Sequence, residues 1–167
     1  MAALEIDVVI ESPLWAEQPQ AERIVHEAII AAAKRASRDD GEVAVLLADD
    51  STLRDLNRRW RGQDKPTNVL SFPASDGATL PQLSGQFAPH LGDIAIAFET
   101  LAREAEGEGK SFAHHLAHLS IHGYLHLLGY DHITEQEASV MEQLETALLA
   151  TLGIPDPYIH TSTESPT

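Results

Sequence analysis

The stretch His122-Gly123-Tyr124-Leu125-His126-Leu127-Leu128-Gly129-Tyr130-Asp131-His132 closes a long predicted helix. Residues four apart share one helix face, so His122 and His126 can reach a single ion. Gly129 accepts the left-handed backbone that ends a helix, and the turn can bring His132 back towards the same face. Three neutral imidazoles bind one divalent cation, with zinc the best match, and leave a fourth position for water.

An isolated pair of histidines four residues apart is more often a surface or core feature than a pair of ligands. Here a third histidine follows behind a glycine at an offset that a turn can close, which favours a metal site. His118 and His114 continue the spacing, but each step of four residues drifts about 40° around a helix. We expect His118 to neighbour the site and His114 and His115 to be ordinary helix residues.

The histidine and glycine spacing of this stretch is also that of the metzincin proteases. Those enzymes carry a glutamate directly after the first histidine, where it acts as the general base for the zinc-bound water. This chain has Gly123 at that position, and glycine carries no proton. The lack of a general-base glutamate at this position therefore argues against a peptidase.

Hydrophobic periodicity predicts an α+β fold, or a closely related α/β layer: a small central sheet of about four strands with packed helices. The metal-binding helix falls in the C-terminal half. The predicted strands are Leu4–Ile10, Val43–Ala48, Asn68–Phe72 and Leu91–Phe98, and the predicted helices are Gln20–Ser37, Thr52–Arg61, Thr100–Glu106, Ser111–Leu128 and Thr134–Leu152. Residues 74–90, rich in Gly, Pro, Ser and Gln, are expected to form a long exposed loop.

Length and composition set the class of protein. The chain has 167 residues, which suggests a single domain over residues 1–158 and a polar tail over 159–167. It has no cysteine, hence no disulfides, and no apolar run of the roughly 20 residues that cross a bilayer. The N-terminal residues lack the features of a signal peptide, so we expect a soluble cytoplasmic protein.

The charge is unevenly distributed. A formal net charge of -15 argues against general nucleic-acid binding, because phosphates would be repelled. However, five of the 11 Lys and Arg residues lie between Arg54 and Lys65, and six of the nine histidines lie between His114 and His132. The two clusters are therefore local features on an acidic background.

The basic cluster has two interpretations, a solvated helix face or a phosphate-binding site. A guanidinium pairs with phosphate oxygens in a fixed fork, which favours the second. Arg61 ends its predicted helix beside a glycine and is the best placed to point into a cleft. Arg58, Arg59 and Lys65 are expected to contact substrate phosphates.

With both clusters considered, the chain resembles the YbeY endoribonuclease family of bacteria. The resemblance is carried by residues 122–132, Leu56-Asn57, Arg61-Gly62, Asp64-Lys65-Pro66-Thr67-Asn68-Val69-Leu70-Ser71-Phe72-Pro73, Leu91-Gly92-Asp93-Ile94, Met141-Glu142 and Pro157-Tyr158. It covers the chain from about Leu4 to Tyr158. The loop 74–90 and the polar tail are not explained by it.

The resemblance implies a metal-dependent, single-strand-specific endoribonuclease that matures the 3′ end of 16S rRNA and takes part in ribosome quality control. It implies one zinc ion held by His122, His126 and His132, and a functional arginine at Arg61. The implied partners are ribosomal RNA and the small ribosomal subunit, with a small-subunit ribosomal protein or an assembly GTPase as further candidates.

Several alternatives stay open at this stage. A zinc hydrolase of another substrate, peptidase-like, and a ribosome-assembly factor with a structural metal are the competing functions. The nucleophile is either water or the RNA 2′-hydroxyl, and the general base is unassigned. Asp131 either supports His132 as a neighbouring carboxylate or caps the turn.

Overall fold

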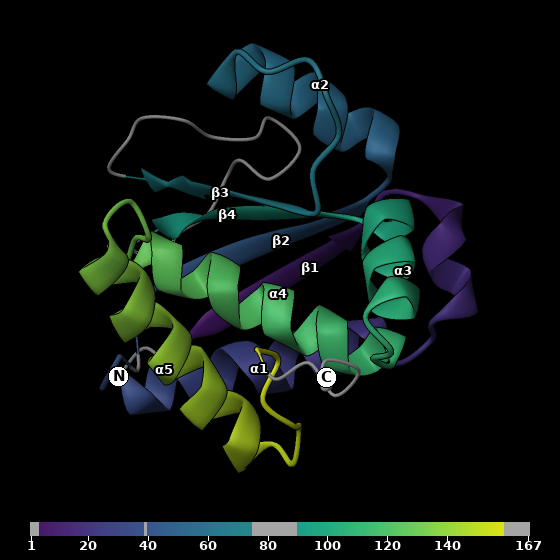
Figure 1. Cartoon of the computed structure of the whole chain (residues 1–167). Coiled ribbons are helices and arrows are strands. Elements are labelled where there is room, and N and C mark those ends of the chain that lie inside the picture. The colour runs from purple at the N-terminus through teal and green to yellow at the C-terminus, as the bar shows by residue number, and fades with distance from the viewer. Residues whose placement is uncertain (1–3, 39, 75–89, 159–167) are drawn as a thin grey trace.

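The computed structural model describes residues 4–38, 40–74 and 90–158 and confirms the α+β fold, with a four-stranded sheet between layers of helices (Figure 1). The elements are β1 (Glu5–Ile10), η1 (Pro13–Glu17), α1 (Ala21–Arg35), β2 (Glu42–Ala48), α2 (Asp50–Arg61), β3 (Val69–Pro73), β4 (His90–Ala97), α3 (Phe98–Gly107), α4 (Phe112–Leu127) and α5 (Glu135–Thr151). Within these residues no helix is both long and apolar enough to span a bilayer. The expected polar tail over 159–167, and all but the ends of the predicted loop 74–90, lie outside the described residues.

The sheet has the strand order β1-β2-β4-β3. Strands β1, β2 and β4 are parallel, and β3 is the antiparallel edge on β4. Strand β2 lies at the centre and every one of its residues is buried, which explains its continuous apolar run. Its side chains alternate between two cores, with Val43, Val45 and Leu47 on one face and Ala44, Leu46 and Ala48 on the other.

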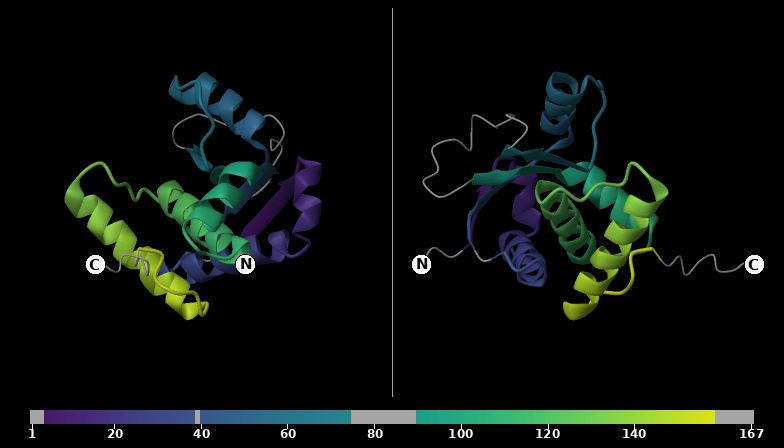
Figure 2. Two further views of the ribbon diagram at one scale, coloured as in Figure 1. Left: turned by 45° about the vertical axis from the view of Figure 1, so that its right-hand side comes forward. Right: turned by 90° about the vertical axis from the view of Figure 1, so that its left-hand side faces the viewer.

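The helices are divided unequally between the two faces of the sheet. Helix α2 covers one face, while α4 lies across the other with α1 and α5 packed beside it (Figures 1 and 2). Helix α4 contacts both β3 and β4 as well as three other helices. Helix α4 therefore packs against β3 and β4, the two strands that α2 contacts from the opposite face.

Element boundaries differ from the prediction where tertiary contacts decide them. Helix α2 begins at Asp50 rather than Thr52, because Asp49 Oδ1 caps it by accepting from the backbone N–H of Thr52 at 2.9 Å. Helix α3 begins directly after β4, and its first residue, Phe98, was predicted as strand. A 3-10 helix was missed after β1; it buries Trp15, whose indole donates to the Ala48 carbonyl at 2.8 Å.

Candidate metal centre and the adjoining cavity

Helix α4 and the turn after it bring three imidazoles together. Gly129 has φ +106°, the left-handed conformation that the sequence predicted for the helix stop. The turn folds His132 back, so that its ring centroid lies 5.0 Å from that of His126 and 5.6 Å from that of His122. One ring nitrogen of each histidine lies within 4.8 Å of the other two. The three predicted ligands therefore form one cluster.

The geometry and the chemistry of this cluster fit a zinc ion. The Nε2 atoms of His122 and His126 lie 3.1 Å apart, close to the roughly 3.3 Å edge of a tetrahedron with Zn–N bonds of about 2.0–2.1 Å. Burial, together with the neighbouring His122 and His132, lowers the pKa of His126 below its ordinary value. The neutral imidazole that binds a metal is thus the favoured form of His126 at neutral pH.

A buried carboxylate on α5 supports the cluster, and the sequence analysis missed it. Glu145 is 0% exposed; its Oε2 accepts from His122 Nδ1 and its Oε1 from His118 Nε2, each at 2.7 Å. The hydroxyl of Tyr158 also donates to Oε1. Burial opposes ionisation of Glu145, but the hydrogen bonds from His118 and His122 outweigh it and lower its pKa to about 2. Glu145 is therefore a carboxylate throughout the physiological range.

One signal in the sequence pointed to Glu145. The buried positions of α5 are Met141, Glu145, Leu148 and Leu149, spaced as one helix face. An acidic residue on an otherwise apolar stripe needs a partner when it is buried, because an unpaired carboxylate there is costly. Its partners, however, come from another helix and could not be named from spacing alone.

The other three histidines of α4 are His114, His115 and His118, and none of them belongs to the cluster. His118 neighbours the centre, as expected, and shares Glu145 with His122. His115 lies in the helix outside the cluster, as expected; it is buried, 4% exposed, and its Nε2 lies 2.8 Å from Oε1 of Glu104. His114 is half-buried in the first turn of the helix, where its backbone N–H bonds to the cap residue. Among the described residues, the cluster therefore consists of His122, His126 and His132.

Asp131 stabilises the turn through the backbone. Its Oδ1 accepts from the backbone N–H of His132 at 2.8 Å. This bond holds the backbone of the turn at His132. Of the two roles considered for Asp131, the contact supports the one in which its carboxylate caps the turn.

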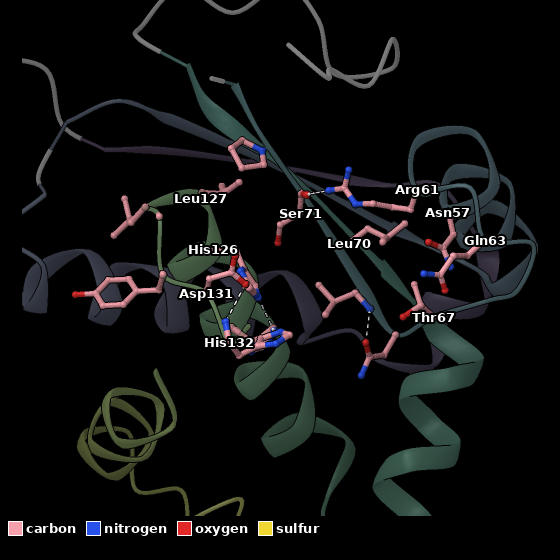
Figure 3. A pocket seen from close by; sticks show the side chains of 17 residues that line it. Asn57, Arg61, Gln63, Thr67, Leu70, Ser71, His126, Leu127, Asp131 and His132 are labelled. Atoms are coloured by element: carbon pink, nitrogen blue, oxygen red, sulfur yellow. Dashed lines mark hydrogen bonds between the residues drawn. The ribbon is translucent and has the colours of Figure 1, made fainter. Parts of the chain in front are cut away.

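A cavity of about 790 Å³ joins the histidine cluster to the end of α2 (Figure 3). Arg61 lines it, held by an Nη2 bond to the Ser71 carbonyl at 2.7 Å and by its position 5.1 Å from the centre of the Phe72 ring. The other lining residues come from the loop before β3, β3 itself, the end of α4 and its turn, and include His122, His126, Asp131 and His132. A guanidinium and the histidine cluster thus face one space, which suits an anionic ligand.

The other basic residues of the cluster lie elsewhere. Arg58 and Arg59 both pair with Asp55, and Arg54 pairs with Asp64 at 2.8 Å. Among the described residues, the cavity lining includes Arg61 but not Arg58, Arg59 or Lys65. The structure therefore brings Arg61 to the histidines and leaves the other three outside the cavity.

Comparison with known proteins agrees with this architecture. The family model described as Endoribonuclease YbeY matches residues 10–153. A protein named Endoribonuclease YbeY from a Bradyrhizobium species is 54% identical over 154 residues, covering 91% of this chain and 90% of the relative. One of the same name from Rhodopseudomonas palustris is 55% identical over 155 residues, covering 91% and 88%. The chain belongs to the YbeY endoribonuclease family.

The fold also has a counterpart among solved structures. The solution structure of TM1509 from Thermotoga maritima superposes with a TM-score of 0.51 at 22% sequence identity. The match covers 89% of this chain and 91% of that one. At this identity the likeness speaks for the fold alone.

Proposed function

We propose that this protein is a zinc-dependent endoribonuclease that cleaves single-stranded RNA. The observation that carries the proposal is that Arg61 and the cluster of His122, His126 and His132 line one cavity. Membership of the YbeY endoribonuclease family supports RNA as the substrate class. A phosphodiester suits this pairing, because it presents anionic oxygens both to a cation and to a guanidinium fork.

Each group in the cavity has a proposed task. His122, His126 and His132 would hold one zinc ion per chain. The chemistry that such an ion supplies when bound is Lewis-acid polarisation of a phosphate oxygen or acidification of a water molecule. Arg61 uses one N–H on the Ser71 carbonyl and rests against Phe72, so its guanidinium is fixed while further N–H donors stay available for charge that develops on the phosphate.

The proposed biological role is ribosomal RNA processing in the cytoplasm, with maturation of the 16S rRNA 3′ end and ribosome quality control as the specific tasks. The formal net charge of -15 disfavours tight binding to naked RNA. We therefore infer that the small ribosomal subunit, through one of its proteins or an assembly GTPase, supplies much of the affinity. Arg58, Arg59 and Lys65 would contact phosphates outside the cavity.

The test is cleavage of a single-stranded RNA and of casein by the purified protein, with chelator and after zinc is restored. We expect RNA cleavage that the chelator abolishes and zinc restores, and no cleavage of casein. The Arg61→Ala variant should retain zinc but lose RNA cleavage. Casein cleavage would instead identify a peptidase.

A second variant separates a catalytic metal from a structural one. The His126→Ala variant is expected to stay folded and to fail in rRNA maturation. A folded His126→Ala variant that still supports maturation in cells would indicate an assembly factor with a structural metal. Activity on naked RNA should be weak and fall steeply with salt; strong activity indifferent to salt would contradict the inferred role of a ribosomal partner.

A further inference from the structure

Glu145 contacts one of the two ring nitrogens of His122, the Nδ1 atom. A carboxylate accepts hydrogen bonds and donates none, so the contact between Oε2 and Nδ1 at 2.7 Å requires the proton of His122 to lie on Nδ1. The lone pair of the ring then lies on Nε2. That atom is the one 3.1 Å from His126 Nε2, inside the metal cluster. The bond to Glu145 therefore leaves the metal-facing nitrogen of His122 free to act as a ligand.

The carboxylate is itself held from two other sides. His118 Nε2 donates to Oε1 at 2.7 Å, and the Tyr158 hydroxyl donates to the same oxygen. With its proton on Nε2, His118 has a bare Nδ1, and among the described residues that buried atom has no hydrogen-bond partner, as a neutral imidazole of this tautomer permits. The donors come from α4 and from the segment after α5, so the carboxylate has little freedom to rotate.

We propose that Glu145 is a positioning residue for the metal centre: it fixes the tautomer and the ring orientation of His122, and His118 and Tyr158 in turn fix Glu145. The proposal rests on the proposed function of the histidine cluster as a zinc site. Groups that orient a metal-binding histidine in this way are worth about 10- to 100-fold in metal affinity. Glu145 touches neither substrate nor metal and acts only through His122.

A purely structural role for Glu145 makes a different prediction. The same bonds tie α5 and the C-terminal segment to α4, so their loss lowers stability whether or not zinc binds. The Glu145→Gln variant keeps the size of the side chain but replaces an acceptor by an amide that presents N–H groups to donors. The Leu149→Val variant provides a matched control, because it removes one methylene from the buried face of the same helix.

The experiment measures the zinc dissociation constant of the full chain by competition with a chromophoric chelator, alongside the midpoint of thermal unfolding without metal. We expect Glu145→Gln to weaken zinc binding by about 10- to 100-fold and Tyr158→Phe by a smaller factor of about two to ten. Leu149→Val should lower the unfolding midpoint and leave the zinc constant within a factor of about two, as expected for a methylene far from the ligands.

A spectroscopic readout tests the tautomer directly. In the metal-free wild type, ¹⁵N NMR of the histidine rings should show His122 protonated on Nδ1, and in Glu145→Gln this tautomer should lose its dominance. A zinc constant for folded Glu145→Gln equal to that of wild type, or equal weakening in Leu149→Val, would overturn the positioning role. A wild type that binds no zinc would overturn the proposed metal function as well, so the two failures are distinguishable.

Discussion

The hydroxyl of Ser71 donates a hydrogen bond to the carbonyl oxygen of Gly123 at 3.1 Å, joining β3 to α4, the helix that carries His122 and His126. The backbone carbonyl of the same serine accepts the bond from Arg61. A single residue thus contacts both the helix that carries the histidines and the arginine across the cavity. The close approach depends on Gly123, where a Cβ atom would lie 3.0 Å from Ile94 Cγ2 and 3.3 Å from Ser71 Oγ.

The first prediction concerns the position that holds glutamate in the metzincins. Gly123 faces the sheet, so a Gly123→Glu variant would push a charged side chain into Ile94 instead of offering a base to the cavity. We expect it to lose more than about 3 kcal/mol of unfolding free energy and to gain no casein cleavage. Urea unfolding and a casein assay measure both effects. A Gly123→Glu protein as stable as wild type would show that the close packing is not required.

The Gly123→Ala variant is the matched control for that prediction. Its methyl group meets the same atoms, at a crowding cost of about 1–3 kcal/mol, but a helix gains about 1 kcal/mol when alanine replaces glycine. The two effects partly offset, so we expect a net loss below about 2 kcal/mol. Similar losses in both variants would mean that charge plays no part in the glutamate effect.

The second prediction separates Arg61 from the basic residues outside the cavity. Arg61→Ala should lower kcat for RNA cleavage by about 10²- to 10³-fold, because the lost group stabilises charge in the transition state. Arg61→Lys should recover little of this, since an ammonium lacks the planar fork that bonds to Ser71 and stacks on Phe72. Zinc binding should be unchanged in both variants. Full activity of Arg61→Lys would show that Arg61 contributes only its positive charge and not the planar geometry of its guanidinium.

The third prediction concerns Lys65 and Arg58. Both lie outside the cavity lining, so their replacement by alanine should raise KM and leave kcat nearly unchanged. Each lost phosphate contact should reduce the slope of log(kcat/KM) against log salt by about 0.7, the value for single strands. Steady-state kinetics at several salt concentrations measure this slope. An unaltered slope in both variants would exclude them from the RNA-binding surface.

The fourth prediction concerns the pH dependence of stability. Burial opposes ionisation of Glu104, but the hydrogen bonds from His115 Nε2 at 2.8 Å and Asn68 Nδ2 at 3.0 Å outweigh it and hold the pKa of Glu104 below its ordinary value of 4.5. A depressed pKa in the folded state stabilises the protein above pH 4.5. That stabilisation is lost as the pH falls through the pKa of the folded state.

Glu104→Gln should therefore lower the unfolding free energy at pH 7 by about 1 kcal/mol, a value discounted for the partial exposure of the carboxylate. The difference from wild type should shrink as the pH falls below 4.5. Glu108→Gln is the control, because Glu108 forms an exposed pair with Lys110 and should change stability by less than about 0.5 kcal/mol. A pH-independent difference for Glu104→Gln would contradict the assignment of its partners.

The fifth prediction links zinc to folding. A ligand that binds only the folded state at 100 times its dissociation constant stabilises that state by about 2.7 kcal/mol. Zinc should therefore raise the unfolding midpoint of wild type, and chelator should reverse the rise. His126→Ala should show almost no response, since two imidazoles remain. An equal response in His126→Ala would place the ion elsewhere.

The grouping of the three histidines was predictable because its information is local. Helical periodicity and one glycine relate His122, His126 and His132 without help from the rest of the chain, and the structure places them together. The contribution of Glu145 was not predictable in the same way, because it depends on how α5 packs against α4. Periodicity could have placed Glu145 on the buried face of its helix, but it could not have identified the two histidines that Glu145 meets.

In the fold, too, features with a local sequence signal were predictable, and features that depend on distant contacts were not. The buried strand β2 and the helices were predicted from apolar patterns, and a capping box of Thr134 and Glu137 opens α5. The 3-10 helix after β1 was missed although Ser12 caps it and Pro13 opens it; the bond from its Trp15 indole to the Ala48 carbonyl could not be read from local sequence. Likewise, Arg61 was expected in a cleft, but the anchor that holds it is a backbone carbonyl of β3 that carries no sequence signal.

The histidines of the cluster, Glu145, which contacts His122, and Tyr158, which contacts Glu145, are synthesised at different times. A nascent chain that has emerged only as far as His132 carries all three imidazoles of the cluster. The carboxylate that contacts His122, and the hydroxyl that holds this carboxylate, lie later in the chain and are synthesised after the imidazoles. A protein whose proposed substrate is ribosomal RNA is therefore still attached to a ribosome during the interval in which its histidine cluster lacks these contacts.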